Sequence, residues 1–380
     1  MNIVIAIDSF KGSMTSMEAG KSAAEGIRRV YPDAQIQVRP LADGGEGTVE
    51  ALTAGLGGKL VTIPVTGPAG LLVDCPYGIV EETKTAIIEM SGAAGITQVT
   101  EAQRNPLHTT TYGVGEVIKD AIHKGCRRFL VGIGGSATND GGLGMLQALG
   151  FDMLDASGQP VSMFGKGLAD LAQISTDHVF PELADCTFRI ACDVTNPLCG
   201  EHGCSAVFGP QKGATPEIVQ QMDGWLSAYA ALAKNSFPKA NPNHAGAGAA
   251  GGLGFAFLTF FNATLESGVK IVLEETRLSD YVKDADIVLT GEGRLDGQTV
   301  MGKAPIGVAQ TAKEHGCTVL GFSGSVAKDA SACNEKGIDA FFPILRGVST
   351  LEEAMDTEKA RQNMADAVEQ VFRTIHAIRS

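Results

Sequence analysis

Positive charge is scarce in this sequence. Its 380 residues include 30 Lys and Arg against 43 Asp and Glu, so the formal net charge is −13. Nucleic acids and anionic membrane surfaces attract clustered Lys and Arg side chains, and this balance therefore argues against both as partners. The few basic residues that lie in glycine-rich segments become informative, because they are candidates for binding an anionic ligand.

Long apolar runs are also missing. The N-terminal run 2–7 ends at once in Asp8, which is too short for a signal peptide, and no stretch approaches the length of a membrane span. The eight cysteines are scattered and form none of the C-x-x-C pairs of common zinc sites. We therefore expect a cytoplasmic protein with reduced thiols and no membrane partner, and nothing in the composition argues against a homo-oligomer.

Internal repeats, charged tails and low-complexity linkers are absent, and so is the G-x-x-x-x-G-K-[ST] pattern of Walker-type kinases. The length favours two domains over one. Apolar strands alternate with helical segments at both ends of the chain, whereas the region 61–90 has short β runs broken by Gly and Pro. This alternation predicts an α/β protein with mainly parallel sheets.

One glycine loop stands out between an expected strand, 129–133, and an expected helix, 143–149. It reads GIGGSATNDGGLG over residues 132–144. Backbone amides approach an anion closely only where side chains are small, and the start of a helix adds free N–H groups. The candidate anion-binding residues here are Gly134, Gly135, Ser136, Thr138 and Asn139. The same composition also suits tight turns and close helix packing, and the loop alone does not decide between the two.

Polar residues or glycines follow several of the expected strands directly. They are Asp8, Asp43, Gly134, Asp193, Gly291 and Ser323. In open parallel sheets, ligands bind at the carboxyl ends of the strands. We therefore expect these strand ends to line one cleft, with each domain supplying a wall.

Charged side chains accompany these strand ends. Asp43 and Glu46 are separated by glycines, so that both could turn toward one metal ion or simply form an acidic turn. Lys11 could reach a phosphate or pair with Asp8. Asp193 could act as a base, bind a metal or cap a loop.

Two further segments are candidates for binding. The polar stretch 291–302 and the residue after it contain Glu292, Arg294, Asp296 and Lys303, a density that favours a site over a solvated loop. Lys212 and the glycine tract 245–254, with Gly251 and Gly252, could bind a nucleotide. Close helix packing explains these glycines nearly as well.

Seven segments together resemble the bacterial type I glycerate kinases, in the same order along nearly the whole chain. They are IDSFKG (7–12), LADGGEGT (41–48), GIGGSATNDGG (132–142), ACDVTNPL (191–198), FGPQKGA (208–214), GAAGGLG (248–254) and TGEGRLDGQTVMGKAP (290–305). Ile7 differs from some relatives, which carry proline there.

The resemblance implies two α/β domains, a discontinuous one over 1–75 and 268–380 and an inserted one over 76–267, with the active site in the interdomain cleft. It also implies transfer of the ATP γ-phosphoryl group to D-glycerate with Mg²⁺, more often giving 2-phosphoglycerate than 3-phosphoglycerate. A kinase for another hydroxy acid or small sugar, or a non-catalytic metabolite sensor, remains the alternative.

For the chemistry we expect a carboxylate to remove the proton of the attacking hydroxyl, with Asp193 as first choice and Asp8 as second. Candidate ligands for magnesium are Asp43, Glu46 and Asp296. Lys11, Arg294 and Lys303 would bind the glycerate carboxylate or the moving phosphoryl group. The loop 132–144 would hold the nucleotide phosphates.

Overall fold

The chain folds into two compact units, each with its own sheet. The computed structural model describes residues 1–42, 45 and 47–379. One unit comprises Met1–Asp43, Glu50–Leu56 and Val269–Ser380, and the other comprises Gly44–Val49 and Gly57–Gly268. The ends of the chain thus form the first unit, and the middle forms the second.

The first unit contains a parallel five-stranded sheet. Its order is β13-β12-β11-β1-β2. The strands are β1 (Asn2–Ile7), β2 (Gln35–Val38), β11 (Ile287–Leu295), β12 (Thr318–Val326) and β13 (Ala340–Pro343). From β1 the chain proceeds toward one edge and from β11 toward the other, so the topology switches between these two neighbours. Open parallel sheets bind ligands at such a switch point, beyond the carboxyl ends of the strands.

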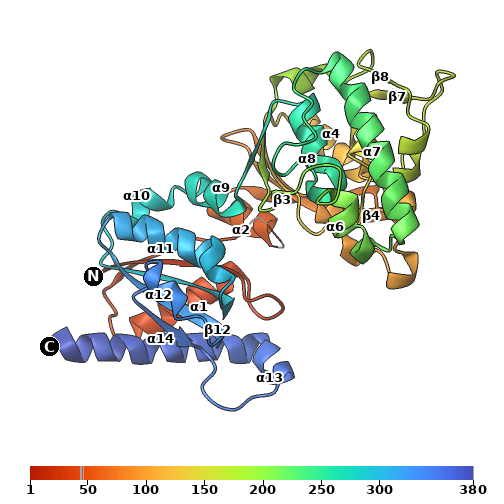
Figure 1. The fold of residues 1–380 in the computed structure, drawn as a ribbon. Coiled ribbons are helices and arrows are strands. Elements are labelled where there is room, and N and C mark those ends of the chain that lie inside the picture. The colour runs from red at the N-terminus through yellow and green to blue at the C-terminus, as the bar shows by residue number, and fades with distance from the viewer. Residues whose placement is uncertain (43–44, 46, 380) are drawn as a thin grey trace. The chain divides into compact units, whose positions relative to one another are not determined.

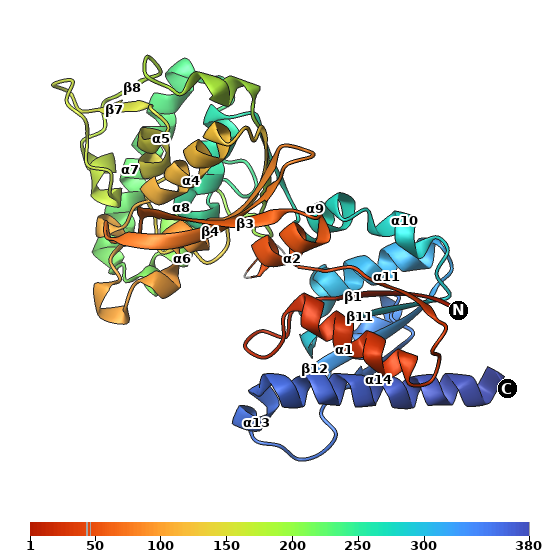
Figure 2. The same ribbon diagram turned by 180° about the vertical axis from the view of Figure 1, so that it is seen from behind.

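Helices cover both faces of this sheet, with α1 and α14 on one side and α11 on the other (Figures 1 and 2). The helices of the unit are α1 (Ser16–Arg28), α2 (Thr48–Gly55), α9 (Gly268–Glu275), α10 (Leu278–Val282), α11 (Ala304–Glu314), α12 (Ala332–Glu335), α13 (Leu351–Met355) and α14 (Thr357–Arg379). A capping box begins α1, because Thr15 Oγ1 accepts from the Glu18 amide and the Glu18 carboxylate accepts from the Thr15 amide.

Strand β11 is longer than the sequence suggested. We expected it to end at Thr290 and a loop to begin at Gly291, but the strand continues to Leu295. The reason is its partner β12, which pairs with it as far as Leu295 and Val326. A Cβ at Gly291 would lie 1.9 Å from the Phe322 carbonyl oxygen, so this glycine permits a close strand contact. Glu292 and Arg294 therefore lie on a strand.

The second unit contains a mixed six-stranded sheet in the order β10-β9-β6-β5-β4-β3. β5, β6, β9 and β10 are parallel, whereas β3 and β4 form an antiparallel edge. Its strands are β3 (Lys59–Thr66), β4 (Leu72–Val80), β5 (Thr85–Glu89), β6 (Arg128–Gly132), β9 (Thr187–Ala191) and β10 (Ala263–Glu266), and β7 (Asp152–Leu154) pairs with β8 (Gln173–Ser175) in a separate ribbon. The prediction of an α/β protein with mainly parallel sheets is confirmed.

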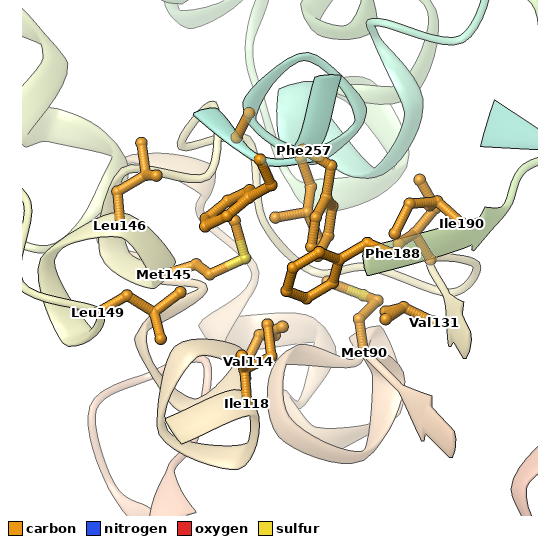
Figure 3. Close-up of a cluster of buried hydrophobic side chains, with 14 of the residues drawn as sticks. Met90, Val114, Ile118, Val131, Met145, Leu146, Leu149, Phe188, Ile190 and Phe257 are labelled. Atoms are coloured by element: carbon orange, nitrogen blue, oxygen red, sulfur yellow. The ribbon is translucent and has the colours of Figure 1, made fainter. Parts of the chain in front are cut away.

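Six helices belong to this unit, counting those in its described residues. They are α3 (Ser91–Ala94), α4 (Tyr112–His123), α5 (Leu143–Ala148), α6 (Cys204–Phe208), α7 (Pro216–Ser236) and α8 (Ala249–Phe260). Apolar side chains of α4, α5 and α8 converge with those of the sheet, among them Ile118, Met145, Phe188 and Phe257 (Figure 3). This core fixes the start of α5, and with it the glycine loop that follows β6.

The strand ends expected to line one cleft are divided between the two sheets. Asp8, Gly291 and Ser323 belong to the first unit, whereas Gly134 and Asp193 belong to the second. By their contacts, residues up to Leu56 group with the first unit and those from Gly57 with the second, and β3 pairs with β4 along its whole length. Among the residues that the structure describes, no helix combines the length and apolarity needed to cross a membrane.

Candidate active site

A cavity of about 420 Å³ opens at the carboxyl edge of the five-stranded sheet. It brings together six of the charged residues predicted from the sequence: Asp8, Lys11, Glu292, Arg294, Asp296 and Lys303. All six come from the first unit, and two chain segments, 8–11 and 292–303, supply them. A pocket of this size suits a drug-sized molecule, and its three cations favour an anionic one.

Asp8 lies directly after β1 and is only 5% exposed. Its backbone amide donates to the Gly291 carbonyl at 2.9 Å, which continues the pairing of β1 with β11. Its carboxylate Oδ1 accepts from the Ser9 amide at 2.6 Å. The strand end thus fixes a carboxylate in the wall of the cavity, next to the loop that carries Lys11.

Glu292 connects β11 to the start of α11. Its Oε1 accepts from Thr299 Oγ1 at 2.7 Å, and its Oε2 lies 3.6 Å from Lys303 Nζ. Lys303 is the N-cap residue of α11, so its backbone position is fixed by the helix that follows. The pair is partly buried and places one cation beside one carboxylate.

Arg294 and Asp296 form a second, more exposed pair. Arg294 Nε lies 3.5 Å from Asp296 Oδ2, and the Arg294 side chain is 67% exposed. Asp296 Oδ1 accepts from the amides of Gln298 and Thr299 at 2.9 and 3.3 Å. Arg294 is therefore accessible to a ligand, whereas Asp296 also shapes the turn before α11.

Carboxylate oxygens are the ligands that Mg²⁺ prefers. Of the described residues, no three His, Cys, Asp or Glu side chains are grouped so as to hold a metal ion. Mg²⁺ commonly takes only one or two carboxylates plus water and substrate phosphates, so the carboxylates of this cavity fit it in chemical type. Because Asp296 Oδ1 already accepts two amides, Asp296 suits contact through water. Asp43 and Glu46 lie outside the described residues.

The apolar wall of this cavity was not predicted from the sequence. Leu351 and Met355 of α13, together with Ile344 beyond β13, line it, and Asn363 of α14 adds an amide. Amphipathic spacing alone would have predicted that these side chains pack into the hydrophobic core beneath their helices. Only the return of the chain past β13 brings them over the charged strand ends.

The glycine loop after β6 presents little of itself to solvent. Gly134 and Gly135 are exposed, whereas residues 136–140 are buried. Asp140 accepts from the Thr111 amide and hydroxyl at 2.8 Å each, and from the amides of Gly142 and Gly144. Burial raises the pKa of Asp140, and these donors oppose that rise. Hydrogen bonds to buried groups therefore hold the loop in place, and only its first turn, Gly134–Ser136, can touch a ligand.

Thr138, Asn139 and Lys212 lie beneath that turn. Lys212 is 3% exposed and donates to Ser136 Oγ at 2.7 Å and to the Thr138 carbonyl at 2.6 Å. Burial lowers the pKa of Lys212 to about 8. Asn139 Nδ2 donates to Ser205 Oγ at 2.8 Å. The Lys212 and Asn139 side chains therefore support the loop from inside the fold, so a bound anion would meet Ser136 and the glycines first.

The glycine tract packs against the same loop. Gly251 has φ +65°, its carbonyl accepts from the Gly141 amide at 2.9 Å, and a Cβ on it would lie 2.1 Å from the Thr138 carbonyl oxygen. A Cβ on Gly252 would lie 2.8 Å from Gly141 Cα. Of the two readings of this tract, close packing accounts for both glycines.

Asp193 lies in the second unit, beyond β9, and it is exposed rather than buried. Its Oδ1 accepts from the amide of Gly268, the first residue of α9, at 3.2 Å. This carboxylate oxygen is therefore already occupied by a backbone donor of the same unit. Glu89, at the end of β5, is a half-buried carboxylate that we did not predict from the sequence. It lies at the same edge of this sheet and accepts from the Val49 amide at 2.9 Å.

The chain matches the Glycerate kinase family over residues 3–376, nearly its whole length. It belongs to the glycerate kinase family. A curated glycerate kinase of Haemophilus influenzae is 47% identical over 375 residues, which is 99% of each chain. The glycerate 2-kinase of Escherichia coli K12 is 45% identical over 354 residues, covering 93% of each chain.

A crystal structure of a glycerate kinase 2 candidate from Salmonella typhimurium LT2 superimposes with a TM-score of 0.92 at 44% identity. The match covers 100% of this chain and 99% of that one. The resemblance inferred from the seven sequence segments is thereby confirmed, and with it the α/β architecture of this family member.

Proposed function

We propose that the protein transfers the γ-phosphoryl group of ATP to D-glycerate, giving 2-phosphoglycerate. The family assignment supports the reaction, and the relative named glycerate 2-kinase supports the position of the phosphate. The observation that carries the proposal is the cavity at the switch point of the five-stranded sheet. It holds three carboxylates and three cations at one edge, and transfer of a phosphoryl group to an anionic alcohol requires groups of both kinds.

Asp8 is our proposed general base. The hydroxyl of glycerate is a weak nucleophile until its proton is removed, and Asp8 is a carboxylate of the cavity that also contains Lys11 and Arg294. Asp193, the first choice from the sequence, is exposed and accepts a hydrogen bond from Gly268. We therefore place Asp8 ahead of it.

Lys11, Arg294 and Lys303 bind the glycerate carboxylate and the moving phosphoryl group. The exposed Gly134 and Gly135, together with the Ser136 hydroxyl beside them, bind a further anionic group. Asp43, Glu46 and, through water, Asp296 are the candidate residues that would hold Mg²⁺, which would neutralise charge on the nucleotide phosphates.

Phosphorus NMR of the product tests the proposal. The purified protein is incubated with D-glycerate, ATP and Mg²⁺, and the new resonance is compared with authentic 2- and 3-phosphoglycerate. We expect stoichiometric ADP and the 2-phosphate. Appearance of the 3-phosphate would correct only the position of transfer.

A parallel ADP-release assay includes other small hydroxy acids and sugars. A higher kcat/KM for one of these than for D-glycerate would replace the proposed acceptor. Calorimetric binding of glycerate without any ADP release would instead favour a metabolite sensor.

A further inference from the structure

Lys212 and Ser136 form a buried pair whose geometry fixes the role of each. Lys212 ends a 3₁₀ turn, Pro210–Lys212, and the following Gly213 has φ +90°. A Cβ on Gly213 would lie 2.1 Å from the Arg104 carbonyl oxygen, so the backbone here is tightly placed. From this turn Lys212 Nζ reaches both Ser136 Oγ and the Thr138 carbonyl within 2.7 Å.

The direction of these hydrogen bonds determines where the Ser136 proton points. An ammonium group has only donors, so Ser136 Oγ must accept from Lys212. The hydroxyl proton of Ser136 then has to be directed away from Lys212. No side-chain or backbone acceptor takes it among the described residues, and Gly134 and Gly135 beside it are exposed, with open space where a Cβ on Gly134 would lie.

We propose that Lys212 is a positioning residue that presets the Ser136 hydroxyl as a hydrogen-bond donor to an anionic oxygen bound at the Gly134–Ser136 turn. The inference rests on the proposed function and gives this turn a defined role in it. The shared ligand chemistry is an anionic oxygen, either of the ATP phosphates or of the glycerate carboxylate. Lys212 itself is too buried to touch that ligand.

The ionisable groups that face Lys212 do not form an ion pair with it, so its positive charge can attract an anion bound at the Gly134–Ser136 turn. The Cys204 thiol of α6 faces it, and burial raises the pKa of that thiol to about 12, so it is neutral. The Asp140 carboxylate also faces it, but this group accepts hydrogen bonds from four other donors. Neither forms a direct ion pair with Lys212, and the ammonium charge therefore supports an anion bound above the loop.

The test compares Ser136→Ala, Lys212→Met and the double variant. A hydrogen bond to a charged group contributes about 1.5–3 kcal/mol, which corresponds to roughly 10- to 100-fold in affinity. We expect Ser136→Ala to raise the KM of one substrate by about tenfold or more, and to leave that of the other nearly unchanged. The affected substrate, ATP or D-glycerate, identifies the ligand of the turn.

The double variant tests whether Lys212 acts through Ser136. If it does, adding Ser136→Ala to Lys212→Met should change KM little further. Multiplying effects, or a wild-type KM for both substrates in Ser136→Ala, would overturn the proposal. Lys234→Met, which removes an exposed lysine from the last turn of α7, is the matched control and should retain wild-type constants.

A pH profile separates this role from a purely structural one. As Lys212 loses its proton above pH 8, its amine can accept the Ser136 proton and the preset direction is lost. The KM of the affected substrate should rise between pH 7 and 9 in the wild type and stay flatter in Ser136→Ala. An unchanged pH dependence in Ser136→Ala would contradict the proposal, and this arm stands even if Lys212→Met does not fold.

Calorimetric titration with ATP and with D-glycerate keeps this test separate from the proposed reaction. If the wild type binds but does not turn over, the proposed function fails. Loss of binding in Ser136→Ala and Lys212→Met would still support the positioning role in that case.

Discussion

Replacing Lys212 by Met should make the difference in stability between variant and wild type depend on pH. Lys212 is 3% exposed, and burial lowers its pKa from 10.5 to about 8. The unfolded chain therefore binds more protons than the folded one between these values. Below pH 8 the cost of burying the charged Lys212 lowers the unfolding free energy of the wild type. This cost decreases as the pH rises toward 10.5.

The pKa values set the size of the effect. A shift of about 2.5 pKa units corresponds to about 3 kcal/mol, because each unit contributes about 1.4 kcal/mol. Between pH 7 and pH 10 the wild type should gain roughly 2–3 kcal/mol of unfolding free energy relative to Lys212→Met. Ionisation of the thiols occurs in both proteins and largely cancels in the difference.

Urea unfolding at a series of pH values measures this difference. The chain has a single tryptophan, Trp225, and it lies on α7 in the same unit as Lys212. Its fluorescence therefore reports the unit that matters. A stability difference that stays constant within about 0.5 kcal/mol from pH 7 to 10 would refute the reasoning, because Lys212 would then titrate as it does in the unfolded chain.

Three further predictions concern other parts of the chain. Gly251→Ala should lower the unfolding free energy by about 2–4 kcal/mol, because the new Cβ would meet the Thr138 carbonyl oxygen and the backbone has a positive φ. The control Gly224→Ala, in α7 with open space around it, should raise the unfolding free energy by up to about 1 kcal/mol. Urea unfolding followed by Trp225 fluorescence compares the two variants. Thr15→Ala should reduce stability by about 1 kcal/mol through loss of the α1 cap, seen as a lower midpoint in circular dichroism, and an unchanged midpoint would mean that the cap contributes nothing. Asp193→Asn should keep turnover within about tenfold of wild type, since an amide oxygen can still accept from Gly268; a larger loss of kcat would return the role of base to Asp193.

Local signals in the sequence predicted much of the fold. The strand expected over 129–133 and the helix expected over 143–149 depend on neighbouring residues, and they appear as β6 (Arg128–Gly132) and α5 (Leu143–Ala148). The continuation of β11 past Thr290 could not be seen in this way. It depends on pairing with β12, and the glycines that look like a loop in the sequence permit the strands to approach.

The candidate site shows the same division. Its charged residues follow strands and could be found one by one, and six of them line one cavity. The apolar wall from α13 depends on how the chain returns after β13, which no periodicity encodes. The contact between Lys212 and Ser136, 76 residues apart, likewise arises only from packing. From the sequence we expected Lys212 to bind a ligand, whereas in the structure its side chain holds the glycine loop in place.

The turnover of Asp8→Asn with D-glycerate and ATP tests the central claim most directly, with Asp33→Asn, outside the cavity, as the control. Asparagine keeps the shape of the side chain but cannot take a proton. We expect kcat to fall by about 10²- to 10⁴-fold in Asp8→Asn and to stay at the wild-type value in Asp33→Asn. Wild-type turnover in a folded Asp8→Asn protein would contradict our assignment of the reaction to this cavity.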